Sequence, residues 1–458
     1  MDKLQSLLGA DKVLNGDDLK ERFFHVWQMN EPVRAKAVIL PRTTEDVSNI
    51  MKLCHEYDQP VVVHGGLTNL VGSTETNGDE IIISTEKMNQ IEEVDEQSRT
   101  MTLQSGVILE NVHRAAEELG LFFPMTFGSK GSAQMGGVIS TNAGGMRVFR
   151  YGMTRNLILG LEVVLPDGTV LSSMKKIIKD NSGYDLKQLF VGSEGTLGIV
   201  TRAVLKLEEK PTSRNSALIA CNDYNNVVSL LKLLDNELAG TLSAFELLWE
   251  INYRTMTTPP SPYNAPLPLG YEYYILVEAL GIDAEYEKER LEKVLEQALV
   301  DGIIEDALVA QSLQNHELFW NLRENVDVLQ AQHKFNQYFD ISLPIPLIGD
   351  YVVETSERIR EIDDVDVCYV HGHVADGNIH FHVGKSNYNQ SLTDEINEVV
   401  YAPLKKLGGS VSAEHGIGLH KKKYLHLCRS EEEIQLMRQL KSTFDPKGIL
   451  NPGRVVDV

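Results

Sequence analysis

Short β-like runs alternate with helical patterns along the first 210 residues. The run AKAVILP at 35–41 is strand-like, and the polar stretch 43–46 resembles a capping box ahead of apolar residues at helical spacing, Val47, Ile50, Met51 and Leu53. Further strand-like runs are EIIIST, TMTLQSG and GIVTRAVLKL. Charge and proline content change at KLEEKPTSRN, residues 206–215. The pattern predicts a first domain of mixed helices and strands over residues 1–210.

The second half of the chain repeats longer units of strand and helix. NNVVSLLKLLDNEL and AEYEKERLEKVLEQALVDG have helical spacing, and EYYILVEALG between them reads as a strand. We expect an antiparallel sheet with helices on one face, over residues 211–420. The segment SEEEIQLMRQLKSTFDP predicts a helical tail within residues 421–458. The fold class expected overall is α+β.

Charge and cysteine usage exclude several classes of function. The net charge of −22 opposes a general affinity for nucleic acid or anionic membranes. We expect no membrane span, because no stretch approaches the roughly 20 apolar residues that cross a bilayer. The N-terminal residues lack the pattern of a signal or transit peptide, and the 4 scattered cysteines form no CxxC pair. A cytoplasmic protein without an iron–sulfur cluster is the expectation.

Three glycine-rich stretches stand in the first domain. They are VVVHGGLTNLVGS at 61–73, FGSKGSAQMGGVISTNAGGMRVFRYG at 127–152 and NSGYDLKQLFVGSEGTLGIVT at 181–201. The first is neither a GxGxxG fingerprint nor a Walker A loop, and alone it is more typical of an ordinary turn. Each glycine inside an element costs about 0.5 to 1 kcal/mol of conformational entropy. Three such loops together indicate a large ligand that lies against the backbone.

These stretches carry a resemblance to a known family. With SVSAEHGIGL and DPKGILNPGR from the C-terminal part, they resemble the FAD-linked D-2-hydroxyacid dehydrogenases of the vanillyl-alcohol oxidase/PCMH flavoprotein superfamily. The resemblance runs from about residue 35 to the C-terminus and is nearest to the members that oxidise D-2-hydroxyglutarate. It implies a PCMH-type FAD-binding domain of two subdomains, an α/β cap domain with an antiparallel sheet, and a C-terminal helical segment that returns to the flavin.

The resemblance also implies which residues hold FAD, which we expect to be non-covalently bound. The candidates are His64, Gly65, Gly66, Leu67, Thr68, Asn69, Gly72, Ser73, Gly128, Gly131, Ser132, Gly136, Gly137, Asn142, Gly144, Gly145, Tyr151, Gly152, Glu194, Gly195, Ile199 and Asn451. Asn69 and His64 depart from the family pattern, which has a small residue at the first position and often Gln or Arg at the second.

The stretch VHGHVADGNIHFHV at 370–383 contains four of the chain's 13 histidines. Asp376-Gly377 between two alternating runs is a strong signal for a two-residue hairpin turn. In that register His373 faces His380 and His371 faces His382, with all four imidazoles on one side of the ribbon. Directly opposed Cβ atoms are about 4.5 to 5.5 Å apart, which suits two imidazoles that share a metal ion. A half-buried hairpin with an imidazole face is the alternative.

A third ligand is available in SVSAEHGIGL, where Glu414 and His415 are consecutive. Two histidines and a carboxylate leave coordination positions open, as a catalytic metal requires, and the donor types favour zinc, with manganese or iron as alternatives. The resemblance assigns His373, His380 and Glu414 to a divalent metal and His415 to the catalytic base. A metal-only protein such as an iron oxygenase is a rival that the glycine loops oppose.

The expected reaction is oxidation of a D-2-hydroxy acid to the 2-oxo acid. Arg323 is a candidate for the substrate carboxylate, and Asn378 for a hydrogen bond to substrate or FAD. Tyr338 stands where the enzymes of D-2-hydroxyglutarate carry a lysine, which Lys334 would have to replace, so D-lactate or another monoacid is an alternative substrate.

The final electron acceptor is also open. It would be electron-transfer flavoprotein, a quinone or a 2-oxo acid, since no NAD fingerprint is present. A flavin oxidase that uses oxygen is a further alternative, and a homodimer is compatible with the resemblance.

Overall fold

The computed structural model describes residues 2–19, 23–26 and 29–458. The chain divides into two compact units. The first consists of residues 1–145, 152–210 and 414–458, and the second of residues 146–151 and 211–413. This division differs from the expected one at two places. The short segment 146–151 joins the second unit, and the return to the first unit begins at Glu414, within the range expected for the cap domain.

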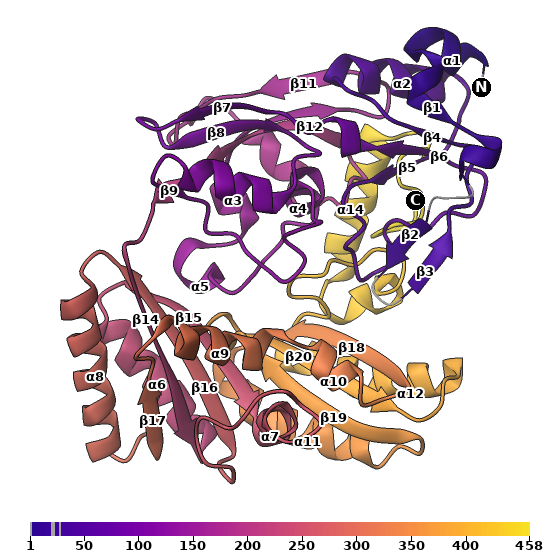
Figure 1. Ribbon diagram of the computed structural model, residues 1–458. Coiled ribbons are helices and arrows are strands. Elements are labelled where there is room, and N and C mark those ends of the chain that lie inside the picture. The colour runs from indigo at the N-terminus through magenta and orange to yellow at the C-terminus, as the bar shows by residue number, and fades with distance from the viewer. Residues whose placement is uncertain (1, 20–22, 27–28) are drawn as a thin grey trace. The chain divides into compact units, whose positions relative to one another are not determined.

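The first unit contains two main sheets (Figure 1). The four-stranded sheet has the order β1 (Val13–Leu14), β4 (Ala37–Ile39), β6 (Ile81–Ser84) and β5 (Val61–His64). The five-stranded sheet has the order β11 (Val170–Ser173), β10 (Ile158–Val164), β12 (Ile199–Lys206), β8 (Thr100–Gln104) and β7 (Ile91–Asp95). The first sheet is mixed, with parallel pairs at β4–β6 and β6–β5, and the second is antiparallel throughout. Two sheets confirm the expected two-subdomain architecture.

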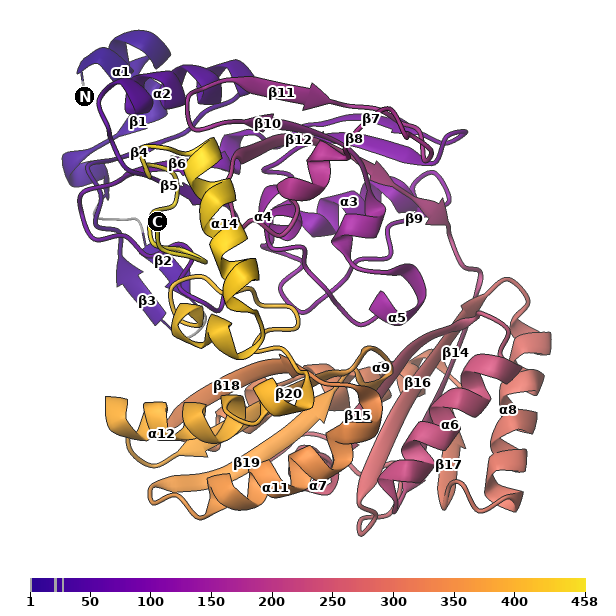
Figure 2. The same ribbon diagram turned by 180° about the vertical axis from the view of Figure 1, so that it is seen from behind.

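Smaller pairs and helices complete this unit. The pairs are β9 (Leu121–Phe122) with β13 (Glu208–Glu209) and β2 (Phe23–Val26) with β3 (Met29–Pro32). The helices are α1 (Asp2–Leu8), α2 (Thr44–Glu56), α3 (Leu109–Glu117), α4 (Met135–Ser140) and α14 (Glu431–Phe444). The tail that follows α14 returns to β5, where Val61 bridges Leu450 in parallel (Figure 2).

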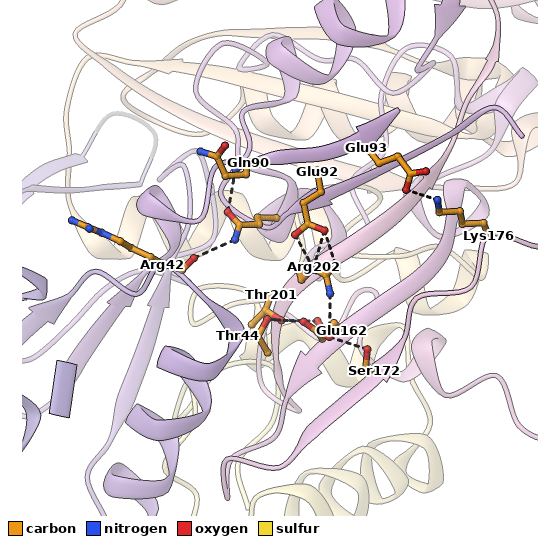
Figure 3. Close-up of polar contacts among 11 residues, drawn as sticks. Arg42, Thr44, Gln90, Glu92, Glu93, Glu162, Ser172, Lys176, Thr201 and Arg202 are labelled. Carbon is orange, nitrogen blue, oxygen red and sulfur yellow. Dashed lines mark hydrogen bonds and ion pairs between the residues drawn. The ribbon is translucent and has the colours of Figure 1, made fainter. Parts of the chain in front are cut away.

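Helix α2 joins the two sheets of the first unit. Its N-cap is Thr43, whose side chain accepts a hydrogen bond from the Asp46 amide at 3.1 Å, as the capping pattern predicts. The apolar face of α2 is buried in a core that also takes residues of β10 and β12. At the start of the helix, Thr44 donates to Glu162 of β10 at 2.6 Å (Figure 3). Arg202 of β12 reaches the same carboxylate at 3.4 Å. Apolar packing and this polar network together fix α2 against the five-stranded sheet.

The second unit is built on one seven-stranded sheet in which all neighbours are antiparallel. Its order is β17 (Asp306–Val309), β14 (Ser213–Cys221), β16 (Tyr273–Gly281), β15 (Leu242–Trp249), β19 (Val365–Gly372), β20 (Asn378–Lys385) and β18 (Phe335–Ser342). Its helices are α5 (Val148–Tyr151), α6 (Tyr224–Glu237), α7 (Glu250–Thr257), α8 (Ala284–Val300), α9 (Leu313–Glu324), α10 (Asp327–Gln330), α11 (Ile348–Arg360), α12 (Gln390–Tyr401) and α13 (Leu404–Leu407).

The expectation that helices cover one face of this sheet is wrong. On one face α7, α9 and α10 pack in a core with Leu248 and Tyr274. On the other face Tyr351 of α11 contacts Phe381, and α6 and α8 lie along β14 and β16 (Figure 2). All nine residues of β16 are buried, as a strand covered on both sides requires. The run YYILVEALG, apolar except for Glu278, is the sequence signal for that double burial.

No described helix combines the length and the apolar character needed to cross a membrane.

Candidate functional site

The histidine hairpin of the second unit differs from its predicted register. His371 pairs with His380, and Tyr369 pairs with His382, so the partners are shifted by two residues from the expectation. The connection is a 3-10 turn, Val374–Asp376, closed by Gly377 with φ +81°. Steric crowding also requires glycine at this position, since a Cβ there would lie 2.5 Å from the Leu343 carbonyl oxygen. The predicted two-residue turn is therefore wrong, because Gly377 is held against Leu343, whose amide donates to the Gly377 carbonyl oxygen at 3.0 Å, and the chain makes one helical turn before it.

A shift of two residues keeps the side-chain face, because side chains alternate with period two. The His371 and His380 ring centroids are 5.2 Å apart, and those of His373 and His380 are 5.3 Å apart with nearly perpendicular planes. His373 approaches His380 from the turn and not from an opposed strand position. Three imidazoles from the end of β19, the turn and β20 thus meet at one place.

Glu246 of β15 organises one side of this cluster. Its side chain is buried, and its Oε1 accepts a hydrogen bond from His373 Nδ1 at 2.6 Å. Its Oε2 accepts from Arg323 Nε of α9 at 2.7 Å. Burial raises the pKa of the Glu246 carboxyl, but the charges and hydrogen bonds of His373 and Arg323 outweigh burial and hold it below its ordinary value. An ionised Glu246 therefore links the candidate metal ligand to the candidate substrate arginine.

Asp340 of β18 organises the other side. This fully buried residue pairs with His380 across the strands. Its Oδ1 accepts from Asn378 Nδ2 at 2.7 Å, and its Oδ2 accepts from the Ala413 amide and from Ser412 Oγ, each at 3.1 Å. The hydrogen bond orients the Asn378 amide with its oxygen free of Asp340. Among the described residues no group donates a hydrogen bond to the buried Asn378 Oδ1, so this oxygen is available to a ligand.

The candidate ligand Glu414 and candidate base His415 follow Ala413 directly in the chain. The preceding segment runs beside β18, where Ser342 and Ser410 exchange backbone hydrogen bonds of 3.1 and 2.8 Å. Asp340 then holds the Ala413 amide. The second unit therefore fixes the backbone up to the peptide bond that joins Glu414, which begins the return segment of the first unit.

His371 and His382 already have protein partners. His371 Nδ1 lies 3.2 Å from the Asn252 amide nitrogen, and His382 Nε2 lies 2.6 Å from Asn336 Oδ1. Burial lowers the pKa of His382 to about 3, so this ring is neutral at neutral pH. Tyr338 contacts the His382 ring with centroids 4.6 Å apart. These two histidines line the cluster and are held by amides.

The glycine loops of the first unit lie against one another. A Cβ on Gly66 would stand 2.1 Å from the Ser132 carbonyl oxygen, so this close approach requires glycine. A Cβ on Gly65 would meet only the edge of a neighbouring loop, with the Gly137 amide nitrogen at 3.8 Å. A Cβ on Gly137 would meet no heavy atom of the described residues within 4 Å. Gly65 and Gly137 therefore border space that a flat cofactor can fill, and in this respect the loops fit FAD.

Asn451 brings the C-terminal tail to these loops, as the sequence indicates. Its Oδ1 accepts from the Val63 amide at 2.9 Å, and its Nδ2 donates to the Glu194 carbonyl oxygen at 2.9 Å. The residue adopts the left-handed conformation, with φ +43°. The tail thus ties the end of β5 to the third glycine stretch.

Several side chains expected to line FAD form hydrogen bonds within the protein. Glu194 accepts from the amides of Ile417 and Gly418 at 2.7 and 2.8 Å and from Ser73 Oγ at 3.1 Å. Burial raises the pKa of the Glu194 carboxyl above its ordinary value, against these donors. His64 Nε2 contacts the Thr74 carbonyl oxygen at 2.9 Å. Glu194 therefore fixes the loop that follows His415, within the first unit.

Tyr151 lies in α5, which belongs to the second unit, whereas Gly152 belongs to the first. Just before this helix, in the same part of the second unit, Arg147 Nε donates to Glu278 Oε1 of β16 at 3.0 Å. The two adjacent candidates for FAD thus stand on different units.

Sequence reasoning missed Glu246 and Asp340. Glu246 is the one acidic residue in the apolar strand LSAFELLW, and a lone carboxylate in a buried strand is itself a signal of a paired charge. Asp340 is likewise the one acidic residue of its strand, FNQYFDIS. The groups that pair with these two carboxylates lie far away in the sequence, so no local sequence pattern could identify them.

Comparisons with known proteins agree with this architecture. The model of the FAD binding domain matches residues 35–173, and the model of FAD linked oxidases, C-terminal domain, matches residues 210–455. The mitochondrial D-2-hydroxyglutarate dehydrogenase of Arabidopsis thaliana is 36% identical over 99% of this chain and 80% of its own length. The D-2-hydroxyglutarate–pyruvate transhydrogenase of Saccharomyces cerevisiae is 33% identical over 99% of this chain and 93% of its own length.

Among solved structures, p-cresol methylhydroxylase has a TM-score of 0.72 at 17% identity, over 100% of this chain and 96% of that chain. This likeness shows the shared fold. The family models cover both units, and the full-length relatives exceed 30% identity. The chain therefore belongs to the FAD-linked D-2-hydroxyacid dehydrogenases of the vanillyl-alcohol oxidase/PCMH flavoprotein superfamily.

Proposed function

We propose that this FAD-dependent enzyme oxidises D-2-hydroxyglutarate or a similar D-2-hydroxy acid to the 2-oxo acid with the help of a divalent metal, zinc being favoured. Metal assistance rests on one observation: the rings of buried His373 and half-buried His380 have centroids 5.3 Å apart, while His373 Nδ1 donates to Glu246. This leaves Nε2 of His373 with its lone pair, as a metal ligand requires.

The proposed ligands are His373, His380 and Glu414. Two neutral imidazoles and one carboxylate are a donor set that suits zinc and leaves room for substrate. A divalent metal held there would lower the pKa of the substrate's 2-hydroxyl and bind its carboxylate. The fixed backbone before Glu414 supports this assignment, because Asp340 holds Ala413 one residue away.

His415 is the proposed base. A neutral imidazole accepts a hydroxyl proton near pH 7, and His415 adjoins the proposed ligand Glu414 in the chain. Glu194 supports its position, because the carboxylate holds the amides of Ile417 and Gly418 just beyond it.

Arg323 is the proposed partner of the substrate carboxylate. Its Nε donates to Glu246, which leaves N–H groups on the terminal nitrogens of the guanidinium that a planar anion can accept from. The terminal nitrogen Nη2 lies 3.4 Å from His373 Nε2, so the guanidinium is close to the proposed metal ligand. Asn378, with its buried Oδ1, is the proposed acceptor for a substrate hydrogen bond.

FAD, when bound by the glycine loops, supplies the acceptor for the C2 hydride at N5. The chain's own contribution is a half-buried backbone cradle at Gly65 and Gly137, held in place by the Gly66 contact and by Asn451.

A D-2-hydroxy monoacid such as D-lactate is the second candidate substrate. Tyr338 lies on the site face of β18 beside His382, and a phenol brings no positive charge to a second carboxylate. Lys334, the nearby cation, is exposed and lies over the Phe335 ring. This arrangement favours a small substrate.

The remaining expectations stay predictions. The electron acceptor is electron-transfer flavoprotein, a quinone or a 2-oxo acid, and the yeast relative is named for transfer to pyruvate. A cytoplasmic location and a homodimer are our proposals, although the name of the Arabidopsis relative places that protein in mitochondria.

An anaerobic screen tests the proposed substrate class. The purified flavoprotein is mixed with D-2-hydroxyglutarate, D-lactate and their L-enantiomers, and bleaching of the flavin band is followed. Selective bleaching by one D-acid supports the proposal and separates the two candidates. Bleaching by none of them, or equal bleaching by both enantiomers, contradicts it. Peroxide formed in step with turnover in air would identify an oxidase instead.

A further inference from the structure

Glu246 lies between two groups that the proposed function uses. Both of its carboxylate oxygens are engaged, one by His373 Nδ1 at 2.6 Å and the other by Arg323 Nε at 2.7 Å. The residue is 0% exposed, so bulk solvent does not reach its charge, which depends on these partners. A buried carboxylate shared in this way fixes both donors at once.

We propose that Glu246 is a positioning residue that holds His373 in the tautomer presenting Nε2 as a metal ligand and orients Arg323 with the same carboxylate. This inference rests on the proposed function. A carboxylate accepts hydrogen bonds only, so Nδ1 of His373 carries a proton, and in the neutral ring that a metal requires Nε2 carries the lone pair. A carboxylate on the far nitrogen of a ligating imidazole fixes its ring and raises its basicity.

The contact from Arg323 agrees with this tautomer. Its Nη2 lies 3.4 Å from His373 Nε2, and a guanidinium only donates, so Nε2 is on the accepting side. Glu246 and Arg323 therefore specify the same tautomer from opposite sides of the ring. The carboxylate couples two functions: displacing it would disturb the metal ligand and the anion-binding group together.

Substitution by glutamine separates this role from simple burial of charge. A glutamine amide has one acceptor oxygen, whereas the two donors of His373 and Arg323 need two acceptors. If the oxygen faces Arg323, the amide NH2 faces His373 and favours the wrong tautomer. If the oxygen faces His373, Arg323 loses its partner. Glu246→Gln thus keeps the volume and breaks the shared function.

Glu278 offers a matched control in the same sheet. It pairs with Ala244 of β15, which precedes Glu246 by two residues, so Glu278 and Glu246 lie on the same face of the sheet. It is equally buried, and it accepts from Arg147 and Arg214 at 3.0 and 2.8 Å. No described hydrogen bond links Glu278 to His373 or His380. Glu278→Gln therefore imposes a similar electrostatic loss without touching the proposed ligands.

The test is the zinc affinity of the FAD-loaded protein, measured by competition with a chromophoric chelator. We expect wild type to bind one zinc ion, Glu246→Gln to bind it about 10- to 100-fold more weakly, and Glu278→Gln to stay within about threefold of wild type. Equal affinity in wild type and Glu246→Gln, or equal weakening in both variants, overturns the inference while leaving the proposed metal in place. Absence of zinc binding in wild type contradicts the metal in the proposed function and the inference with it.

A second measurement covers the case in which Glu246→Gln does not fold. Nitrogen-15 NMR of histidine-labelled, metal-free wild type reports the tautomer of each ring, and the His373 signal is assigned by its loss in His373→Gln. A proton on Nδ1 is the expected result. A proton on Nε2 overturns the inference irrespective of any variant.

Discussion

Two adjacent glycines of α4 separate a structural role from a cofactor role. A Cβ on Gly136 would stand 2.8 Å from Ser105 Cβ. An ordinary carbon–carbon contact of about 3.5 Å is roughly 0.7 Å longer, so Gly136→Ala overpacks this site and should cost about 1 to 3 kcal/mol of unfolding free energy. A Cβ on Gly137 would contact no atom within 4 Å in the part of the chain that the structure describes. Because alanine favours a helix, Gly137→Ala should leave the apoprotein unchanged or stabilise it by up to about 1 kcal/mol.

The effects on FAD binding should have the opposite order, with Gly137→Ala the more damaging of the two substitutions. If the cofactor lies against the backbone at Gly137, a methyl group there intrudes on it directly, and we expect at least a tenfold loss of FAD affinity, or about 1.4 kcal/mol. The assays are urea unfolding of the apoprotein and FAD titration by flavin fluorescence. A Gly137→Ala variant that binds FAD as tightly as wild type would refute the cradle. A large loss of apoprotein stability in the same variant would refute the claim that this face is open.

The remaining predictions concern the base, its support and acid stability. His415→Asn should abolish anaerobic flavin bleaching by substrate while FAD and metal content stay at wild-type levels, and unchanged bleaching would remove His415 as the base. Asp340→Asn should lower the bleaching rate at least tenfold with FAD retained, because the anchor of Asn378 is weakened; an unchanged rate would show that this anchor is dispensable. Burial and the Arg214 charge lower the pKa of His316 to about 4. The unfolded chain therefore takes up this proton first as pH falls below the ordinary value of 6.5, and wild type should lose about 3 kcal/mol more than His316→Gln between pH 6.5 and 4. Parallel stability profiles of the two proteins would contradict that shift.

The sequence predicted the parts of the fold that local patterns encode. The capping pattern at Thr43 and the apolar face of α2 are present as expected. The alternation of strands and helices correctly indicated an antiparallel sheet in the second unit. It failed to show that both faces of the sheet are covered, because helical spacing says where a helix begins and ends but not which face it packs on.

The candidate site shows the same division between local and distant information. The face shared by the histidines was predictable, since a register shift of two residues preserves it. The shift itself was not, because the turn Val374–Asp376 is set by contacts with Leu343 and by the pairing of β18 with β20. The carboxylates of Glu246 and Asp340 act on residues far away in the sequence, so tertiary structure was needed to reveal them.

We propose that reduction of the flavin by a D-2-hydroxy acid depends on the bound metal. The most direct measurement is the rate of anaerobic flavin bleaching by D-2-hydroxyglutarate and by D-lactate in one preparation, first as purified, then after removal of metal by a chelator, and again after zinc is restored. We expect rapid bleaching by one of the two acids, loss of at least 90% of the rate in the metal-free protein with FAD still bound, and recovery with zinc. Full-rate bleaching in rigorously metal-free protein would contradict the claim.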